Sequence, residues 1–212
     1  KGEPGTIGVE EGNKRRAEME NAARMVGIDF AVNTVCTSEG KTSGIFAGGL
    51  AESYHEAVKY AQQVYATDVQ YNLDVGIFNA FPKDNGVVQS FNALNVWSTR
   101  NKNKQVVKLG GTIIICSSCP DGVGYHGLTD RGMRLYIRRD KHGSFKHIFT
   151  DRNIIFFSPT LIPRDIHDFL PKSTLLYRKW SLLIEELKNR YPQKIDVGVF
   201  PCGPLQINNQ VL

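Results

Sequence analysis

The sequence predicts an α/β fold: a Rossmann-like three-layer domain with a mostly parallel sheet flanked by helices. Short apolar runs rich in β-branched residues alternate with amphipathic, helix-like segments along the chain. GGTIIICSS, residues 110–118, is the strongest of the strand-like runs. LDVGIF, residues 73–78, has the composition of a strand buried on both faces. Strands that alternate with helices in this way favour a parallel sheet.

The expected elements of the first half are, in order, helix 14–26, strand 28–37, helix 51–65, strand 73–78 and helix 84–97. Gly27 stands where a helix would end in a left-handed C-cap, and Asp84 stands where a side chain would cap the last of these helices. The second half is expected to contain strand 110–118, a helix within 128–139, strand 153–159, helix 177–191 and strand 194–201.

The 212 residues contain no linker, repeat or low-complexity stretch, so we expect one domain over residues 1–212. No run approaches the ~18 apolar residues of a membrane span, and the first residues have no apolar signal segment, so no membrane partner is expected. Four cysteines are too few for a disulfide scaffold, which favours a reducing, cytoplasmic setting. The absence of an initial methionine hints at a longer protein.

The stretch FPKDNGVVQSFNALN, residues 81–95, follows a predicted strand directly. In parallel sheets, ligands bind where the carboxyl ends of strands lead into helices. We therefore expect Lys83 and Gln89 to point towards a crevice there. The loop after strand 110–118 is expected to open at the same edge and to bring His126 with it.

One alternative for that loop is a nucleotide site. Gly122, Gly124 and Gly127 spell G-x-G-x-x-G, whose glycines let a backbone approach a pyrophosphate. The pattern begins well after the strand, however, whereas the fingerprint requires an immediate turn. Asp140, at the spacing of the ribose-binding acid, does not follow a strand-like run. A glycine-rich loop for another ligand fits these positions better.

Other motifs have plainer interpretations. Cys116-Ser-Ser-Cys119 is a C-x-x-C pair, but Cys116 falls inside a strand-like run, so Cys119 is expected to be a small packed residue. There is no H-E-x-x-H and no second C-x-x-C, so no metal site is predicted. The basic residues from Arg131 to Lys146 alternate with acids, which favours a solvated face and no nucleic-acid partner.

Several segments, taken together, resemble the C-terminal domain of the nickel-dependent lactate racemase family. LDVGIFNAFPKDNGVVQSFNAL, residues 73–94, is the most specific match, and VVKLGGTIIICSSCPDGVG, residues 106–124, follows it in order. The other matching segments are Glu11-Gly12-Asn13, AARMVGIDFAVNTV, AGGLAESYHEAV, SPTLIP and VGVFPCGPLQI. The resemblance extends from about residue 10 to residue 207.

This resemblance implies a two-domain isomerase that racemises or epimerises 2-hydroxy acids in a cleft between its domains. The cofactor of the family is a nickel pincer nucleotide, attached to a lysine, which takes a hydride from the carbon bearing the hydroxyl and returns it to either face. Histidines act as general acid and base. The family's catalytic histidines, its pincer-bearing lysine and its nickel-binding histidine all precede the segment that matches Glu11.

The resemblance therefore implies that this chain is a C-terminal domain without catalytic residues of its own. We expect it to be inactive alone, to form one wall of the active site and to partner its own N-terminal domain, which would bind most of the cofactor. Its small-molecule partner would be a 2-hydroxy acid. A nucleotide-binding oxidoreductase domain and a non-catalytic ligand-binding domain are the alternatives.

From this domain the family contributes a glutamine and, three residues later, a lysine near the substrate and cofactor. Gln89 matches the glutamine, but Asn92 stands in place of the lysine. Because a cation that would bind a small carboxylate is lost, lactate itself is not the expected substrate. Lys83 is expected to supply charge from the neighbouring turn. The expected substrate- and cofactor-binding set is Gln89, Asn92, Lys83, Asp84 and His126.

Overall fold

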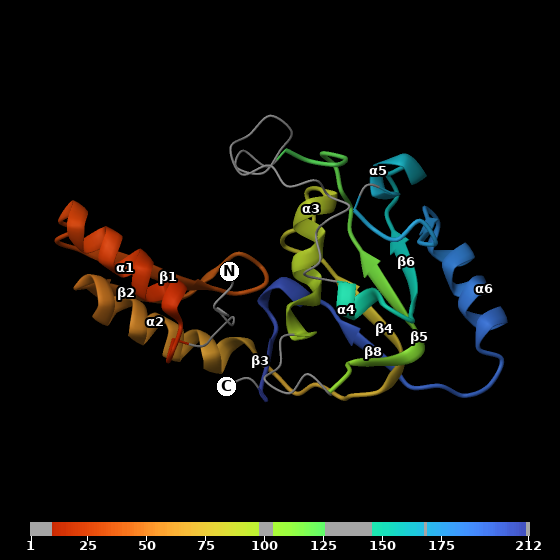
Figure 1. Cartoon of the computed structure of the whole chain (residues 1–212), viewed down its shortest axis with the longest axis horizontal. Coiled ribbons are helices and arrows are strands. Elements are labelled where there is room, and N and C mark those ends of the chain that lie inside the picture. Colours follow the sequence, from red (N-terminus) through yellow and green to blue (C-terminus); the bar gives the residue numbers. More distant parts are fainter. Residues whose placement is uncertain (1–9, 98–103, 126–145, 168, 211–212) are drawn as a thin grey trace. The chain divides into compact units, whose positions relative to one another are not determined.

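The computed structural model describes residues 10–97, 104–125, 146–167 and 169–210 (Figure 1). The helix expected within 128–139, most of the basic stretch and His126 lie outside these residues. The chain divides into two compact units. The hairpin unit comprises residues 1–69, 95–101 and 205–212, and the sheet unit comprises residues 70–94 and 102–204. The sequence analysis treats residues 1–212 as one domain because it finds no linker, repeat or low-complexity stretch that would divide the chain.

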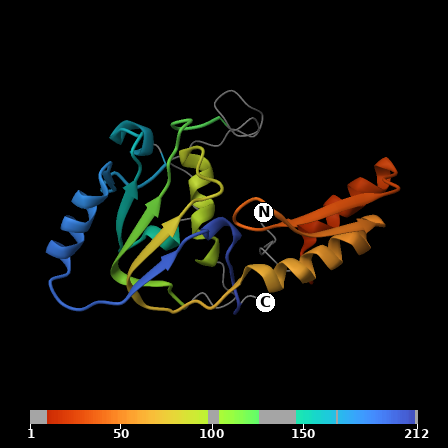
Figure 2. The same cartoon turned by 180° about the vertical axis from the view of Figure 1, so that it is seen from behind.

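The sheet unit is built on a five-stranded parallel sheet in the order β7-β6-β5-β4-β8 (Figures 1 and 2). Its strands are β4 (Leu73–Asn79), β5 (Val107–Cys116), β6 (Asn153–Phe157), β7 (Leu175–Tyr177) and β8 (Val197–Phe200). The α/β fold with a mostly parallel sheet is thus confirmed. Strand β7 is missing from the sequence analysis, which assigns Tyr177 to a helix that in fact begins at Trp180.

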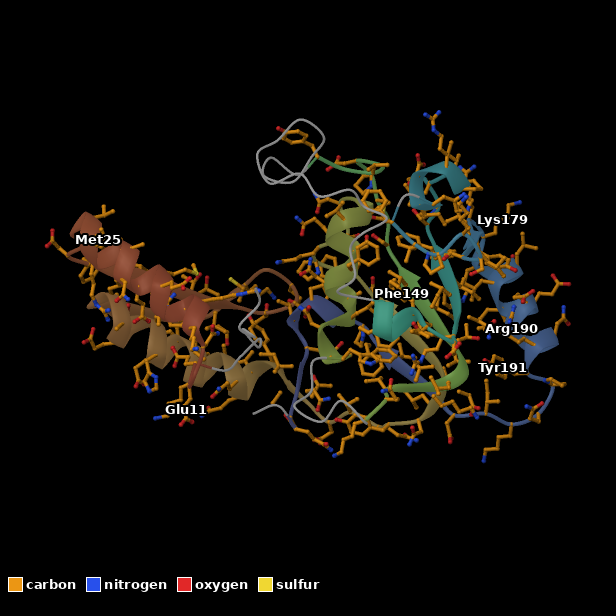
Figure 3. The ribbon with its side chains drawn as sticks, viewed as in Figure 1. Glu11, Met25, Phe149, Lys179, Arg190 and Tyr191 are labelled. Carbon is orange, nitrogen blue, oxygen red and sulfur yellow. The ribbon has the colours of Figure 1, made fainter. Side chains whose placement is uncertain are left out.

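The central strands are buried on both faces, as their continuous apolar sequences predict. Ile113, Ile114 and Ile115 of β5 are all fully buried. Burying an aliphatic side chain of this size contributes about 1.5–3 kcal/mol each, so this strand is a main source of stability. On one face, helix α6 (Trp180–Arg190) inserts Leu183 against the strands. Its end is fixed by Tyr191, whose hydroxyl lies 2.8 Å from Thr112 Oγ1 (Figure 3).

The other helices that the structure describes between residues 87 and 205 are short. They are α3 (Val87–Ser90), which continues as the 3₁₀ helix η1 (Phe91–Trp97), then α4 (Lys146–Phe149), α5 (Pro163–His167) and η4 (Gly203–Leu205). Phe91 packs against Phe149, with ring centroids 6.3 Å apart, and thereby joins η1 to α4. The helix expected over residues 84–97 begins three residues later than predicted, and most of it has 3₁₀ geometry.

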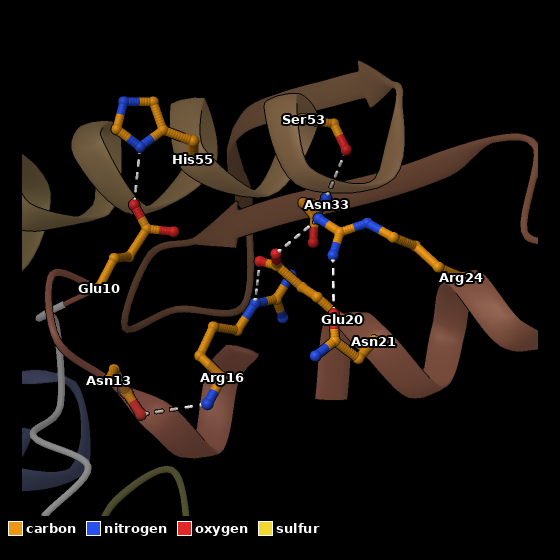
Figure 4. Close-up of polar contacts among 9 residues, drawn as sticks. All are labelled: Glu10, Asn13, Arg16, Glu20, Asn21, Arg24, Asn33, Ser53 and His55. Carbon is orange, nitrogen blue, oxygen red and sulfur yellow. Dashed lines mark hydrogen bonds and ion pairs between the residues drawn. The ribbon is translucent and has the colours of Figure 1, made fainter. Parts of the chain in front are cut away.

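The hairpin unit contains an antiparallel pair of strands, β1 (Ala31–Cys36) and β2 (Thr42–Gly48). Helix α2 (Leu50–Tyr65) packs on one face of the pair, where Asn33 Nδ2 donates to Ser53 Oγ at 3.0 Å (Figure 4). The rings of Phe46 and Tyr60 meet on the same face, with centroids 5.5 Å apart. A second pair, β3 (Ala66–Thr67) and β9 (Ile207–Asn208), is parallel.

Helix α1 (Lys14–Val26) precedes this hairpin and is held by polar contacts (Figure 4). Glu20 pairs with Arg16 at 2.8 Å and with Arg24 at 3.2 Å. The helix ends at Gly27, whose φ of 79° is the left-handed C-cap conformation that the sequence predicts. Just before α1, Glu10 Oε2 lies 2.7 Å from His55 Nδ1 of α2.

Candidate functional site

The candidate site lies at the carboxyl edge of the parallel sheet, where β4, β5 and β6 end. Strand β4 has β5 on one side and β8 on the other, so the connections from β4 and into β8 run in opposite directions along the sheet. Open α/β sheets bind ligands in the crevice at such a reversal of strand order. The segment after β4, which carries most of the expected site residues, begins at this point.

Backbone hydrogen bonds fasten the loop after β4 to the loop after β5. Cys119 N–H donates to Asp84 O at 2.8 Å, and Asp121 N–H donates to Asn85 O at 3.0 Å. At the start of α3, Val87 N–H donates to Gly122 O at 3.2 Å. The two loops therefore form one framework and not two separate flexible segments.

Asp84 is part of this framework, and the prediction that it caps a helix is wrong. The N-cap of α3 is Gly86, with no side-chain bond. Asp84 Oδ2 instead accepts from Ser118 Oγ at 2.6 Å, and its carbonyl also accepts from Ser117 Oγ at 3.2 Å. Both Asp84 and Asn85 bond to the neighbouring loop. The helix therefore begins only after these two residues in the sequence. Asp84 thus holds the loop after β5.

Gln89 and Asn92, three residues apart, are brought together by the helical geometry of α3 and η1. Asn92 Nδ2 donates to the backbone oxygen of Gln89 at 2.8 Å and to Gln89 Oε1 at 3.3 Å. Both side chains are half-buried. Because the amide oxygen of Gln89 receives this bond, its two N–H groups are directed away from Asn92 and can donate to another acceptor. Asn92 therefore orients the glutamine.

Lys83 lies in the turn that precedes these residues. The peptide bond between Phe81 and Pro82 is cis, and Lys83 N–H donates to Ala80 O at 2.6 Å to close the turn. The side chain of Lys83 is exposed. The structure thus places Lys83, Asp84, Gln89 and Asn92 along one segment at the carboxyl edge, while His126 lies outside the described residues.

A buried cluster of hydroxyl groups beneath the loops is the feature that the sequence analysis misses. Ser90 Oγ donates to Ser117 Oγ at 2.7 Å, and Cys119 Sγ donates to Ser117 Oγ at 3.1 Å. Next to them, at the exposed side of the cluster, Thr160 Oγ1 lies 3.1 Å from Ser158 Oγ and donates to Ser118 O at 2.6 Å. The sequence feature that could have indicated this cluster is that the strand-like runs of β5 and β6 both end in serine, at Ser117 and Ser158. These bonds join the ends of β5 and β6 to α3.

Cys119 is fully buried, which confirms that it is a packed residue. Burial raises the pKa of its thiol, and burial raises the pKa of the Cys116 thiol to about 12. Both sulfurs are therefore protonated at neutral pH, and the pair lacks the low thiol pKa of a redox centre.

The glycines of the G-x-G-x-x-G pattern that the structure describes have a packing role. Gly122 and Gly124 both have positive φ, of 62° and 78°. A Cβ on Gly86 would lie 2.9 Å from the Cα of Gly124, so the loop after β5 rests directly on the start of α3. Gly127 lies outside the described residues. Close approach of two backbones thus accounts for Gly86 and Gly124 without a bound pyrophosphate.

Neither a metal site nor a membrane span is found in the described part of the chain. Its histidine, cysteine, aspartate and glutamate side chains form no group of three that could hold a metal ion. Among the same residues, no helix combines the length and apolar character needed to cross a bilayer.

Comparison with known proteins gives one sequence relative and a shared fold. No protein-family model matches the chain. Lactate racemase of Lactiplantibacillus plantarum is 24% identical over 123 residues, which are 56% of this chain and 28% of that protein. The lactate racemase apoprotein of Thermoanaerobacterium thermosaccharolyticum has a TM-score of 0.71 at 18% identity, over 94% of this chain and 50% of that chain.

A Thermotoga maritima protein also matches, with a TM-score of 0.54 at 14% identity over 92% of this chain and 54% of its own. The chain thus spans about half the length of the solved structures it matches. Likeness at this level of identity shows the fold. Together with the sequence match, it confirms the resemblance to lactate racemase that the ordered motifs indicate.

Proposed function

We propose that this chain is the C-terminal part of a longer, lactate racemase-like enzyme that racemises or epimerises a 2-hydroxy acid. The supporting observation is that the segment resembling the family's substrate-binding stretch lies at the reversal of strand order in a sheet of the lactate racemase fold. This is where such sheets bind their ligands. The carboxyl edge would form one wall of the active site, and the reactive wall would lie in the rest of the protein.

The residues described here fit a binding role and not the nickel site. They contain no group of metal-ligating side chains, so the nickel pincer nucleotide would be held mainly by the N-terminal domain. That cofactor supplies the hydride chemistry when bound. This chain would contribute hydrogen-bond donors and charge that orient the substrate.

Gln89 would donate an amide N–H to an oxygen of the hydroxy acid, in the orientation that Asn92 imposes. The exposed ammonium of Lys83 would pair with the substrate carboxylate. Asp84 would hold the loop after β5 in place, because its carboxylate accepts a hydrogen bond from Ser118. Since Asn92 is neutral where the family has a lysine, the carboxylate would be bound less tightly at that position, and lactate itself is not the expected substrate.

The test is an assay of the longer parent protein, loaded with its cofactor, on a panel of 2-hydroxy acids. Hydrogen bonds to charged groups contribute about 1.5–3 kcal/mol, so Gln89→Ala should lower kcat/KM about 10- to 100-fold. Lys83→Ala should mainly raise KM. Lys172→Ala is a matched control, because Lys172 is also exposed but lies before β7, at the opposite edge of the sheet. The 212-residue chain alone should show no turnover.

A parent protein that is inactive on every 2-hydroxy acid would exclude the racemase proposal. If the parent is active but both Lys83→Ala and Gln89→Ala leave kcat/KM unchanged, the racemase proposal stands. The carboxyl edge is then excluded as the wall that binds the substrate. The two results therefore separate the function from the site.

A further inference from the structure

The hairpin unit has an apolar face that the described residues of that unit leave exposed. Val32 pairs with Ala47, and Thr34 pairs with Ile45, so these four residues project from the same face of the β1–β2 pair. Val32 is 60% exposed and Ile45 is 65% exposed. The opposite face, which carries Asn33, is the one that α2 covers. A two-stranded sheet depends on packing for its stability, and here α2 supplies that packing on one face of the pair and not on the other.

Helix α1 contacts α2 through Arg16, whose guanidinium lies 3.3 Å from the centre of the Tyr54 ring, but it buries no apolar side chain. None of its thirteen residues, all of which the structure describes, is buried. Met25, near its end, is 89% exposed and projects from the helix, and Val26 beside it is also exposed (Figure 3). Isolated helices of fewer than about 12–15 residues are marginal in water, and most helices in proteins are stabilised by packing of an apolar face. The ion pairs of Glu20 are too weak to replace that packing.

We infer that the hairpin unit is an incomplete packing unit. The face formed by Val32, Thr34, Ile45 and Ala47, together with α1, packs against the part of the longer protein outside this chain. The solved lactate racemase apoprotein, of which this chain matches only half, shows that a protein of this fold contains enough additional polypeptide to do so. The proposed covering is thus intramolecular, a domain of the same polypeptide, and neither a second copy nor an unrelated protein.

This inference rests on the proposed function only in assuming a longer parent protein. The sheet unit contains its own buried core, whereas the hairpin unit would complete its core with residues from elsewhere. The boundary between the two parts of the parent would then lie within this chain, between the hairpin unit and the sheet unit.

The experiment compares the double variant Val32→Thr/Ile45→Thr in the parent protein and in the 212-residue chain. Threonine is β-branched and keeps the strand propensity, so the change mainly removes apolar contact. In the parent we expect Tm to fall by about 5 °C or more, because buried methyl groups are lost. In the 212-residue chain, which lacks the proposed covering, the Tm of the hairpin unit should change little. Val199→Thr is the matched control, since Val199 is a strand valine of the sheet unit with 62% exposure.

An unchanged Tm in the parent would overturn the inference, and so would an equal loss in the short chain, because the residues would then stabilise the hairpin unit by themselves. Sizing by light scattering provides a further test. If the parent forms dimers that the double variant separates into monomers, a second copy covers the face and the inference is wrong. These readouts need no turnover, so an inactive parent would reject the proposed function without affecting this result.

Discussion

At the scale of single residues, burial decides the chemistry of the C-x-x-C pair. Only the thiolate is a strong nucleophile, and a thiolate loses its hydration when it is buried. Burial raises the pKa of Cys116 to about 12, and burial also raises the pKa of Cys119, although its hydrogen bonds with Ser117 and Ser90 act in the opposite direction. The sequence places Cys116 inside a strand, and this location is the reason that the pair differs from a redox motif.

We predict that neither thiol of this pair reacts in the folded protein. In a Cys36→Ser/Cys202→Ser background, only Cys116 and Cys119 remain. With a pKa of about 12, roughly one Cys116 in ten thousand is ionised at pH 8. Labelling by a thiol reagent should therefore be about a thousandfold slower in the folded than in the unfolded protein. Rapid labelling of folded protein, or a disulfide formed under mild oxidation, would contradict this prediction.

At the scale of elements, the contact between α3 and the loop after β5 depends on two glycines. Gly86 has φ of −152°, an extended conformation that any residue adopts, so its need for glycine comes from space alone. A Cβ there would lie 2.9 Å from Gly124 Cα and 3.1 Å from Val123 O, both of which are backbone atoms. Backbone cannot rotate away as a side chain can, so the loop itself would have to move.

We predict that Gly86→Ala destabilises the sheet unit by about 1–3 kcal/mol, the usual cost of overpacking, measured on the urea unfolding transition of that unit. Gly122→Asn is the control. Gly122 has φ of 62°, which asparagine tolerates, and a Cβ there would meet nothing within 4 Å. The control should therefore remain within about 0.5 kcal/mol of the parent sequence. Equal stability of the two variants would show that the glycine contact is not required.

The sequence predicts long elements better than it predicts their ends. β5 and α2 are expected within three residues of their observed bounds, because each has a long run of consistent apolar spacing. The three-residue strand β7 has too few residues to show alternation, so Tyr177 is assigned to the following helix. Aspartate commonly caps the N-terminus of a helix. The carboxylate of Asp84 instead accepts a hydrogen bond from Ser118, which is distant in sequence. The serines at the ends of the β5 and β6 runs are the sequence signal for the hydroxyl cluster, but its hydrogen bonds join elements distant in sequence, so the sequence does not reveal which groups pair.

At the scale of the whole molecule, the hairpin unit and the sheet unit differ in the hydrophobic side chains that each one buries. Among the described residues, the hydrophobic side chains buried in the hairpin unit are Val35, Ala57, Val96, Trp97 and Ile207. All the other buried hydrophobic side chains belong to the sheet unit, including the cluster of Val75, Ile114, Ile155 and Leu183. Because hydrophobic burial is the main favourable term in folding, the sheet unit should be the more stable of the two.

We therefore predict that the 212-residue chain unfolds in two steps, with the hairpin unit unfolding first. Scanning calorimetry should show a calorimetric enthalpy larger than the van't Hoff enthalpy, because two units unfold separately. Leu183→Ala, which removes a fully buried side chain from the sheet unit, should lower only the upper transition. Ala57→Gly, in the middle of α2, is the counterpart in the hairpin unit and should lower only the lower one. A single transition with equal enthalpies, shifted by both variants, would show that the units fold as one cooperative body.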